Sequence, residues 1–429
     1  MAFKKDFLWC VSGAAAQQDG GYFDGGKGLN IWEAVSDGHI KNNDNCYVAC
    51  DHYHRWKDDF KLLKEIGVNS YRFSISPARI YPSDEFTVNA EGIRFYVDLV
   101  NELTRMKITP MITLYHWDMP LWLHRKGGWK NPMAIEWFER YTKTIIDALS
   151  DKVEYWLTFN EPQCFINMGY GTGEHAPFEK NCAAEMQNIS RNVMLAHGRA
   201  VKVIREHAKM SPKVGFAPTS GGLYVPSTVR SEKQAYEDSF SVIGGAGRTA
   251  WWSDPIVLGK KWEGCDWLSE EDLKAIHQPL DFYAYNIYQA SNPREIGCVG
   301  SPRTAIGWPV TPECMYWSAK FFYDRYKLPI LITENGMANM DFVYEDGKVH
   351  DPQRGEFLRQ YIRQLKHAAD EGVPILGYSC WSFMDNFEWA EGYEKRFGLV
   401  YVDYTTQERI IKDSAYVYRD IIKSNGENL

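Results

Sequence analysis

Short apolar runs alternate with helical patterns along the whole chain. Eight runs have the near-continuous apolar character of strands that are buried on both faces, as the strands of a parallel sheet are. We expect these strands at residues 7–11, 70–75, 110–115, 155–160, 213–217, 281–288, 329–334 and 375–383. Between them, apolar residues at helical spacing predict helices, for example over residues 56–66, 132–150 and 351–371.

Eight alternations of strand and helix favour a closed (β/α)8 barrel, or TIM barrel, over an open sheet. The open alternative is a doubly wound fold, but no G-x-G-x-x-G follows the first expected strand, so its dinucleotide-binding form has no support. No linker or low-complexity segment interrupts the 429 residues. Because such barrels can exceed about 400 residues as one unit, we expect a single domain over residues 1–429.

The first apolar run superficially resembles a signal peptide. Lys4 and Lys5 precede it, and the small residues Ser-Gly-Ala-Ala-Ala follow at 12–16, where a cleavage site would lie. Asp6 interrupts this pattern, however, and the apolar stretch after it is short. We therefore expect the segment to be the first buried strand of the barrel.

Charge and cysteine content restrict the partners. The net charge of −8 disfavours nucleic acid and anionic membranes, and no apolar run approaches the roughly 20 residues that span a bilayer. Nine cysteines without regular spacing favour a reduced, cytoplasmic compartment. His52 and His54 have no third ligand nearby in the sequence, so we expect no metal and no other cofactor. The oligomeric state is left open.

Two glutamates lie where the active site of such a barrel is found, at the C-terminal ends of strands. Glu161 follows the fourth expected strand and Glu334 ends the seventh. Two carboxylates on either side of one bond are the requirement of glycoside hydrolysis, with retention at a separation of about 5–5.5 Å and inversion at a wider one. Either glutamate alone could instead cap a helix or pair with Arg72. Both together favour catalysis, but the sequence fixes neither their separation nor their roles.

The roles depend on the surroundings of each carboxyl group. A nucleophile must stay ionised and needs a cation and hydroxyl donors nearby, whereas an acid keeps its proton beside apolar walls and a negative charge. Further polar and aromatic side chains lie near the strand ends, where the active site of such a barrel is found: Gln17, Arg72, His116, Trp117, Asn160, Asn286, Tyr288, Trp381, Glu388 and Trp389. A tryptophan such as Trp381 is more often part of a core, but its place at a strand end favours a sugar platform.

Four segments, in order, match the signatures of one enzyme family. They are Phe-Leu-Trp at 7–9 with Gln17 and Gly20, Thr-Phe-Asn-Glu-Pro at 158–162, Ile-Thr-Glu-Asn-Gly at 332–336, and Asp-Asn-Phe-Glu-Trp-Ala-Glu-Gly-Tyr at 385–393. One such pentapeptide is a moderate signal, and four together are a strong one. The chain thus resembles family 1 of the glycoside hydrolases, the β-glucosidase family, over nearly its whole length.

The resemblance implies a retaining β-glycosidase that hydrolyses terminal β-D-glucosyl residues, with galactosyl and fucosyl residues as further candidates. It implies that Glu334 is the nucleophile and Glu161 the acid/base, and that the partner is a small β-glycoside or oligosaccharide. Asn160 would bind the sugar 2-hydroxyl, and Arg72 and Tyr288 would hold Glu334. The remaining implied contacts come from Gln17, His116, Glu388 and Trp389 with Trp117 beside them, from Trp381 as stacking floor, and from Phe397 closing the pocket.

Three positions depart from the family pattern. Asp19 stands where glutamate is usual, Pro77 where tryptophan is common, and Ile287 where tyrosine is frequent. None of them removes a catalytic group, so they put in doubt only the fine shape of the pocket and hence the sugar preference.

Three rival functions are considered. A 6-phospho-β-glycosidase of the same family would carry serine in place of Glu388 and tyrosine in place of Phe397. A thioglucosidase would carry glutamine in place of Glu161. A non-catalytic sugar-binding relative would usually have lost one of the two carboxylates. The residues present at these positions disfavour all three rivals.

Overall fold

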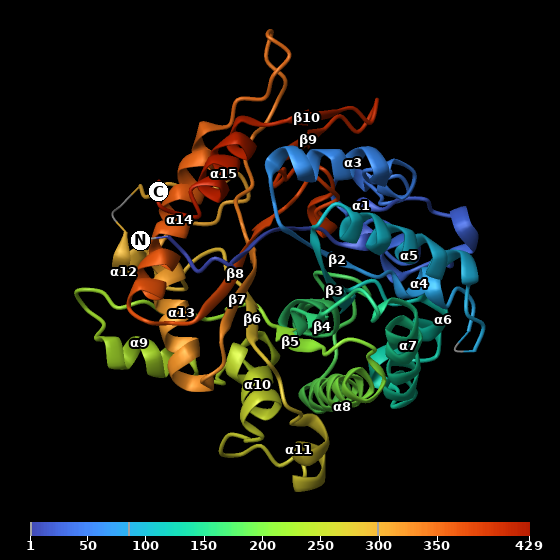
Figure 1. Ribbon diagram of the computed structural model, residues 1–429. Coiled ribbons are helices and arrows are strands. Elements are labelled where there is room, and N and C mark those ends of the chain that lie inside the picture. The colour runs from blue at the N-terminus through green and yellow to red at the C-terminus, as the bar shows by residue number, and fades with distance from the viewer. Residues whose placement is uncertain (1, 85, 298–299) are drawn as a thin grey trace.

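The computed structural model describes residues 2–84, 86–297 and 300–429, and it has parallel strands at its centre with helices around them (Figure 1). One sheet contains eight strands in the order β5-β4-β3-β2-β1-β8-β7-β6. Their bounds are β1 (Leu8–Ser12), β2 (Ser70–Ser74), β3 (Thr109–Tyr115), β4 (Tyr155–Asn160), β5 (Lys213–Ala217), β6 (Tyr283–Asn286), β7 (Ile330–Asn335) and β8 (Ile375–Trp381). Asn286 exchanges backbone hydrogen bonds with residues just beyond β5, so the ring closes. The predicted (β/α)8 barrel is confirmed.

The strand predictions differ from the structure mainly at β6. Strands β4 and β5 have the predicted bounds, but β6 is half as long as the predicted 281–288. The apolar run continues past it, yet the register with β7 shifts between Tyr285 and Asn286 and ends the ladder. The predicted strand 375–383 likewise ends two residues early, at Trp381.

The N-terminal run is a strand, as predicted. All five residues of β1 are buried, and β1 lies between β2 and β8 in the sheet. The two ends of the chain meet beside it (Figure 1): the Phe3 backbone N–H donates to the Asn425 carbonyl at 3.0 Å, and the Asn425 side chain donates to the Phe3 carbonyl at 2.7 Å.

Long helices cover the outside of the barrel: α3 (His52–Ile66), α5 (Ala90–Arg105), α7 (Met133–Leu149), α8 (Ala183–His207), α13 (Glu313–Tyr326), α14 (Pro352–Asp370) and α15 (Asp413–Lys423). The helices predicted at 56–66, 132–150 and 351–371 are α3, α7 and α14, and α3 begins four residues earlier than predicted. Each presents an apolar stripe to the sheet and polar residues to solvent.

Shorter elements lie in the connections. They are α1 (Ala15–Gln18), α2 (Ile31–Ala34), α4 (Pro77–Ile80), α6 (Leu121–Arg125), α9 (Glu232–Ser239), α10 (Thr249–Ser253), α11 (Glu270–Ile276), α12 (Pro293–Ile296), the 3-10 and π turns η1 (Asp24–Gly26), η2 (Lys41–Asn43), η3 (Gly128–Lys130), η4 (Gln163–Thr172), η5 (Gly245–Gly247), η6 (Asp254–Leu258) and η7 (Trp389–Glu391), and the antiparallel pair β9 (Val400–Val402) and β10 (Arg409–Ile411). Several of them follow the C-terminal ends of barrel strands, where they build the walls of a cavity.

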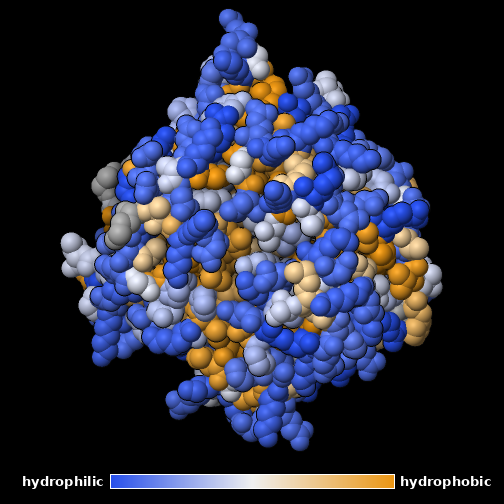
Figure 2. Space-filling view, viewed as in Figure 1, coloured by the Kyte–Doolittle hydropathy of each residue, from blue (hydrophilic) through white to orange (hydrophobic). Residues whose placement is uncertain are grey.

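The barrel interior is filled by apolar side chains, among them Leu8, Met111, Leu157 and Leu331. A larger apolar layer separates the sheet from the helices. Hydrophilic residues cover most of the face seen in Figure 2, with hydrophobic residues in patches between them. In the part of the chain that the structure describes, none of the helices has the length and apolar character needed to cross a membrane.

Candidate active site

A cavity of 510 Å³ lies at the C-terminal end of the barrel, and both predicted glutamates line it. Glu334 is within β7 and Glu161 follows β4 directly, so the barrel brings together residues that are 173 positions apart. Glu161 has a left-handed φ of 44°, as do two other residues of the cavity wall, Trp117 with 76° and Trp389 with 53°. Such conformations cost energy and gather at functional sites.

Glu334 has the surroundings of an ionised carboxylate. One oxygen accepts a hydrogen bond from the Arg72 guanidinium at 2.6 Å, and the other accepts from the Tyr288 hydroxyl at 2.7 Å. Burial raises the pKa of Glu334, and the Arg72 charge and the Tyr288 donor act against that rise. A cation and a hydroxyl donor are the partners that a nucleophilic carboxylate needs.

Glu161 has the surroundings of an acid. Its Oε1 accepts from the Asn286 amide at 2.8 Å and its Oε2 from the Cys164 thiol at 3.1 Å, and neither donor carries a charge. Burial, followed by the negative charge of Glu334, raises the pKa of Glu161 to about 7. The pair therefore has one carboxyl group beside a cation and one that holds its proton near neutral pH.

Asn160 links the two glutamates through their partners. Its side-chain oxygen accepts from Arg72 at 2.7 Å and from Asn286 at 2.9 Å, and its amide nitrogen donates to His116 Nε2 at 3.1 Å. Burial, followed by the Arg72 charge, lowers the pKa of His116 well below its usual value, so the ring is neutral. Since Nε2 accepts, Nδ1 carries the hydrogen, and it has no partner among the described residues, which makes it a donor available to a ligand.

Aromatic rings form much of the cavity wall. Trp117 and Trp389 contact each other with ring centroids 4.5 Å apart, and the His116 ring lies nearly parallel to that of Trp381 at 5.8 Å. Trp381 is also close to the segment that follows Glu334: a Cβ on Gly336 would lie 1.8 Å from the Trp381 carbonyl oxygen. Glycine is therefore required at that position.

Glu388 and Gln17 form a polar corner of the site. The Gln17 amide nitrogen donates to the Phe387 carbonyl at 2.9 Å and approaches Glu388 at 3.4 Å, and its oxygen is buried without a partner in the described chain. Burial, together with the charges of Glu334 and Glu161, raises the pKa of Glu388 to about 8. This corner thus offers an unpaired amide oxygen and a carboxyl group to hydroxyl groups of a ligand.

The predicted residues fall into two layers. Eight of the thirteen line the cavity: His116, Trp117, Glu161, Tyr288, Glu334, Trp381, Glu388 and Trp389. Behind them lie Gln17, Arg72, Asn160, Asn286 and Phe397. Four of these hydrogen-bond to lining residues. Phe397 packs its ring against Tyr288 and Trp308 at 6.2 and 5.9 Å, so it supports the wall from behind.

Sequence reasoning did not assign the other lining residues to the site, which are Cys164, Met168, Glu174, His175, Ile306, Trp308, Ala390 and Glu391. Most belong to connections whose positions no periodic pattern reveals. Outside the segment at 385–393, only Cys164 could have been predicted to lie near the site, because it follows Glu161 by one helical turn. The three departures from the family pattern, Asp19, Pro77 and Ile287, are buried residues and do not line the cavity.

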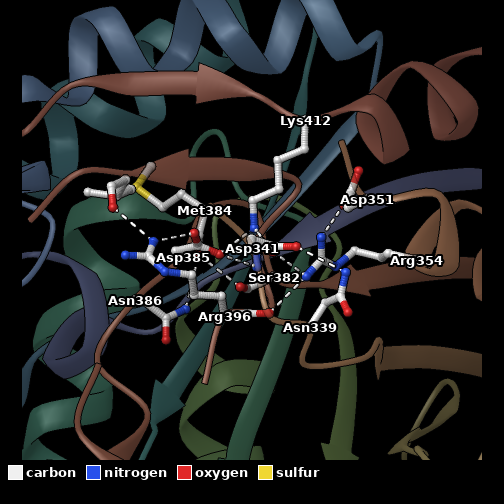
Figure 3. Close-up of polar contacts among 12 residues, drawn as sticks. Asn339, Asp341, Asp351, Arg354, Ser382, Met384, Asp385, Asn386, Arg396 and Lys412 are labelled. Atoms are coloured by element: carbon white, nitrogen blue, oxygen red, sulfur yellow. Dashed lines mark hydrogen bonds and ion pairs between the residues drawn. The ribbon is translucent and has the colours of Figure 1, made fainter. Parts of the chain in front are cut away.

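A network of buried charges holds the loop that carries Glu388 (Figure 3). Asp385 accepts from Lys412 at 2.6 Å and from Arg396 at 2.7 Å. Lys412 also binds Asp341 at 2.6 Å, and Asp341 accepts from Arg354 at 2.6 Å. Arg354 also forms an ion pair with Asp351, so that three aspartates balance the three cations Lys412, Arg396 and Arg354. The segment 385–397 is thereby tied to the loop after β7 and to the start of α15.

No metal site is found in the described ranges: no three histidine, cysteine, aspartate or glutamate side chains are arranged to hold an ion. His52 is bound to Asp59 at 2.7 Å, and His54 to Asp51 at 2.5 Å. The eight described cysteines are free.

Comparisons with known proteins find relatives over nearly the whole chain. A sequence pattern described as glycosyl hydrolase family 1 matches residues 1–427. A 1,4-β-D-glucan glucohydrolase of Thermotoga neapolitana is 40% identical and covers 99% of each chain. A bifunctional β-D-glucosidase/β-D-fucosidase of Bifidobacterium breve is 35% identical over 99% of each chain. A solved structure of a family 1 β-glucosidase from Thermotoga maritima, 39% identical, matches with a TM-score of 0.91 and covers 100% of both chains.

Proposed function

The chain belongs to glycosyl hydrolase family 1, and from this premise we propose that it hydrolyses terminal non-reducing β-D-glucosyl residues, with Glu334 as nucleophile and Glu161 as acid/base. The observation that carries the assignment of roles is the difference in donors. Glu334 accepts from Arg72 and Tyr288, whereas Glu161 accepts only from uncharged groups.

The reaction proceeds by double displacement. Glu334 attacks the anomeric carbon, and the bond to the leaving oxygen breaks as Glu161 gives its proton to that oxygen. Water then gives a proton to Glu161 while its oxygen bonds to the anomeric carbon, and the electron pair of the carbon–Glu334 bond returns to Glu334. Each displacement inverts the anomeric carbon, so the product retains the β configuration.

Sugar recognition follows from the unpaired polar groups of the wall. We assign hydroxyl contacts to Gln17 and His116, which each have a buried polar atom without a partner in the described chain, and to Glu388 and Trp389, which line the cavity. Trp381 is the stacking floor. The Bifidobacterium relative, named for both β-glucosidase and β-fucosidase activity, supports a site that also accepts β-fucosides, and β-galactosides are the further candidate.

A phosphorylated sugar fits this cavity poorly. Glu161, Glu174, Glu334, Glu388 and Glu391 line it, and no lysine or arginine is among its described lining residues. A sugar phosphate would enter a cavity lined by acidic groups, with Glu334 as the proposed carboxylate, and would find no compensating cation among the described lining residues. The acidic lining favours the glucosidase subclass. The presence of both Glu161 and Glu334 favours an active enzyme over a sugar-binding relative.

We also propose the domain organisation, the cellular location and the partner of the protein. Residues 1–429 are taken as one domain, because one apolar layer includes residues from Phe3 to Ile421. The free described cysteines support a reducing, cytoplasmic location. The proposed partner is a small β-glycoside or oligosaccharide, and no cofactor is needed for the steps above.

The stereochemistry of the first product tests the mechanism. The carboxyl groups of Glu161 and Glu334 should lie about 5–5.5 Å apart, and the sugar released first should be the β anomer. Proton NMR of p-nitrophenyl β-D-glucoside hydrolysis, recorded before mutarotation, distinguishes the anomers. Early formation of the α anomer would overturn the retaining mechanism.

The pH profile of kcat/KM should have its alkaline limb near pH 7. Glu161 must be protonated for the first step, and its pKa is about 7, so kcat/KM should fall as the pH rises through 7. Glu334 must be ionised, and burial raises its pKa, so the acid limb should lie above the ordinary range of a glutamate. A profile of kcat/KM for p-nitrophenyl β-D-glucoside checks both limbs. An activity that keeps rising well above pH 8 would contradict the assignment of Glu161.

Glu388→Ser should lower kcat/KM for unphosphorylated glucosides by roughly 10- to 100-fold, because it removes contacts to two adjacent hydroxyls and each hydrogen bond contributes about 0.5–1.5 kcal/mol. It should also improve the ratio for 6-phosphoglucosides, most clearly above pH 8, where the Glu388 carboxyl group is ionised and repels a phosphate. The comparison uses paired phosphorylated and unphosphorylated nitrophenyl glucosides. Glu394→Ser, an exposed change on the same loop that removes a partner of Lys41, is the control. A wild type that already prefers the 6-phosphoglucoside would make the subclass assignment wrong.

A further inference from the structure

A thiol shares the Glu161 carboxyl group with Asn286. Cys164 lies in the first turn of η4, and its backbone N–H donates to the Glu161 carbonyl at 2.9 Å. This turn folds the Cys164 side chain back so that Sγ lies 3.1 Å from Oε2, while the Asn286 amide occupies Oε1 at 2.8 Å. Each oxygen of the carboxyl group therefore has its own neutral donor.

Cys164 lies in the cavity wall, beside the Glu161 carboxyl group. It lines the main cavity and also a neighbouring one of 440 Å³, and Glu161, Tyr288 and Trp308 are shared by both cavities. Because the amide of Asn286 is a stronger donor than the thiol of Cys164, Oε1 stays an acceptor and the proton that Glu161 transfers is held on Oε2, the oxygen that Cys164 contacts. The thiol is thus next to the atom that releases a proton in the first step and accepts one in the second.

The thiol acts as a donor and not as a nucleophile. Burial, followed by the adjacent Glu161, raises the pKa of Cys164 well above its usual value, so the sulfur keeps its hydrogen. A hydrogen bond to an ionised acceptor is about twice as strong as one between neutral groups. The contact therefore favours the carboxylate form of Glu161 over its protonated form.

We propose that Cys164 is a positioning residue for Glu161: its thiol orients and stabilises the carboxylate that takes a proton from water in the second step. In that step the water oxygen bonds to the anomeric carbon, the proton moves to Oε2, and the electron pair of the broken bond returns to Glu334. The inference rests on the proposed function, in which Glu161 is the acid/base.

The variants Cys164→Ala and Cys164→Ser test the role, because alanine and serine have similar volumes and differ in the hydroxyl donor. With Cys164→Ala, the alkaline limb of kcat/KM for p-nitrophenyl β-D-glucoside should move up by roughly half a unit to one pH unit, the equivalent of one lost hydrogen bond. The second step should slow several-fold, seen as a larger burst of dinitrophenol from dinitrophenyl β-D-glucoside. Cys164→Ser should restore both, and Cys182→Ala, at an exposed cysteine that lines neither cavity, should match the wild type.

The outcomes separate this inference from the proposed function. If the limb of Cys164→Ala coincides with that of the wild type, or if Cys164→Ser shifts as far as Cys164→Ala, then Cys164 only fills space and the inference is wrong. If the wild type shows no alkaline limb that depends on Glu161, or does not hydrolyse the glucoside, the proposed function itself fails. Thermal unfolding of each variant checks that the fold is kept.

Discussion

Glu161→Gln should separate the two chemical steps. Dinitrophenol is a good leaving group that hardly needs a proton, so Glu334 should still be glycosylated by dinitrophenyl β-D-glucoside. Release of the sugar should then be slow, because no base activates water. Alkyl glucosides, which need protonation, should lose about 10²- to 10⁴-fold in kcat/KM, the usual contribution of an acid/base group.

Two measurements follow the intermediate in this variant. A burst of dinitrophenol should precede slow turnover, and mass spectrometry should find the added sugar on the peptide that contains Glu334. Glu139→Gln, the same change at a surface ion pair with Arg199, is the matched control and should behave as the wild type. Equal slowing of both substrates with no trapped sugar would make Glu161 a binding or structural residue, with Glu388 the next candidate for acid/base.

Glu334→Gln should abolish turnover of both substrates, because no covalent intermediate can form. By analogy with the loss of an enzyme nucleophile elsewhere, kcat should fall by roughly 10⁴- to 10⁶-fold. No burst and no labelled peptide should appear, in contrast to Glu161→Gln. The variant also leaves the buried Arg72 without its charged partner, so its thermal unfolding must be compared with that of the wild type.

The contrast between leaving groups is the control for this variant. Loss of a nucleophile affects dinitrophenyl and alkyl glucosides alike, whereas loss of an acid affects mainly the alkyl glucoside. If Glu334→Gln kept the dinitrophenyl activity and lost only the alkyl activity, the roles of the two glutamates would be reversed.

The fold could be predicted because burial on both faces leaves a clear pattern in the strands. The bounds of β4 and β5 were predicted to the residue, since each is a short apolar run between turn signals. The extent of β6 could not be predicted, because the apolar run at 281–288 outlasts the backbone pairing. The strand ends where its register with β7 shifts, and that pairing cannot be read from the apolar run of β6 itself.

The positions of the two glutamates could be predicted from their place at strand ends, but their electrostatics could not. What distinguishes Glu334 from Glu161 is the Arg72 guanidinium, which comes from β2, and the Tyr288 hydroxyl, which follows β6. These contacts form only when the barrel closes. The cavity wall contributed by connections, such as Trp308, was missed for a similar reason, because loop positions follow from packing and carry no periodic signal.

The network around Lys412 has a consequence for biosynthesis. A chain leaves the ribosome N-terminus first, so every residue that lines the cavity emerges before Lys412. Until Lys412 arrives, the three aspartates share only Arg354 and Arg396, so one negative charge of the network has no compensating cation, and an uncompensated buried charge is strongly destabilising. The loop that carries Glu388 is therefore expected to reach its final position only when the last part of the chain has been made. A polypeptide that ends before residue 412 would contain every described lining residue and still lack the charge balance that holds this loop.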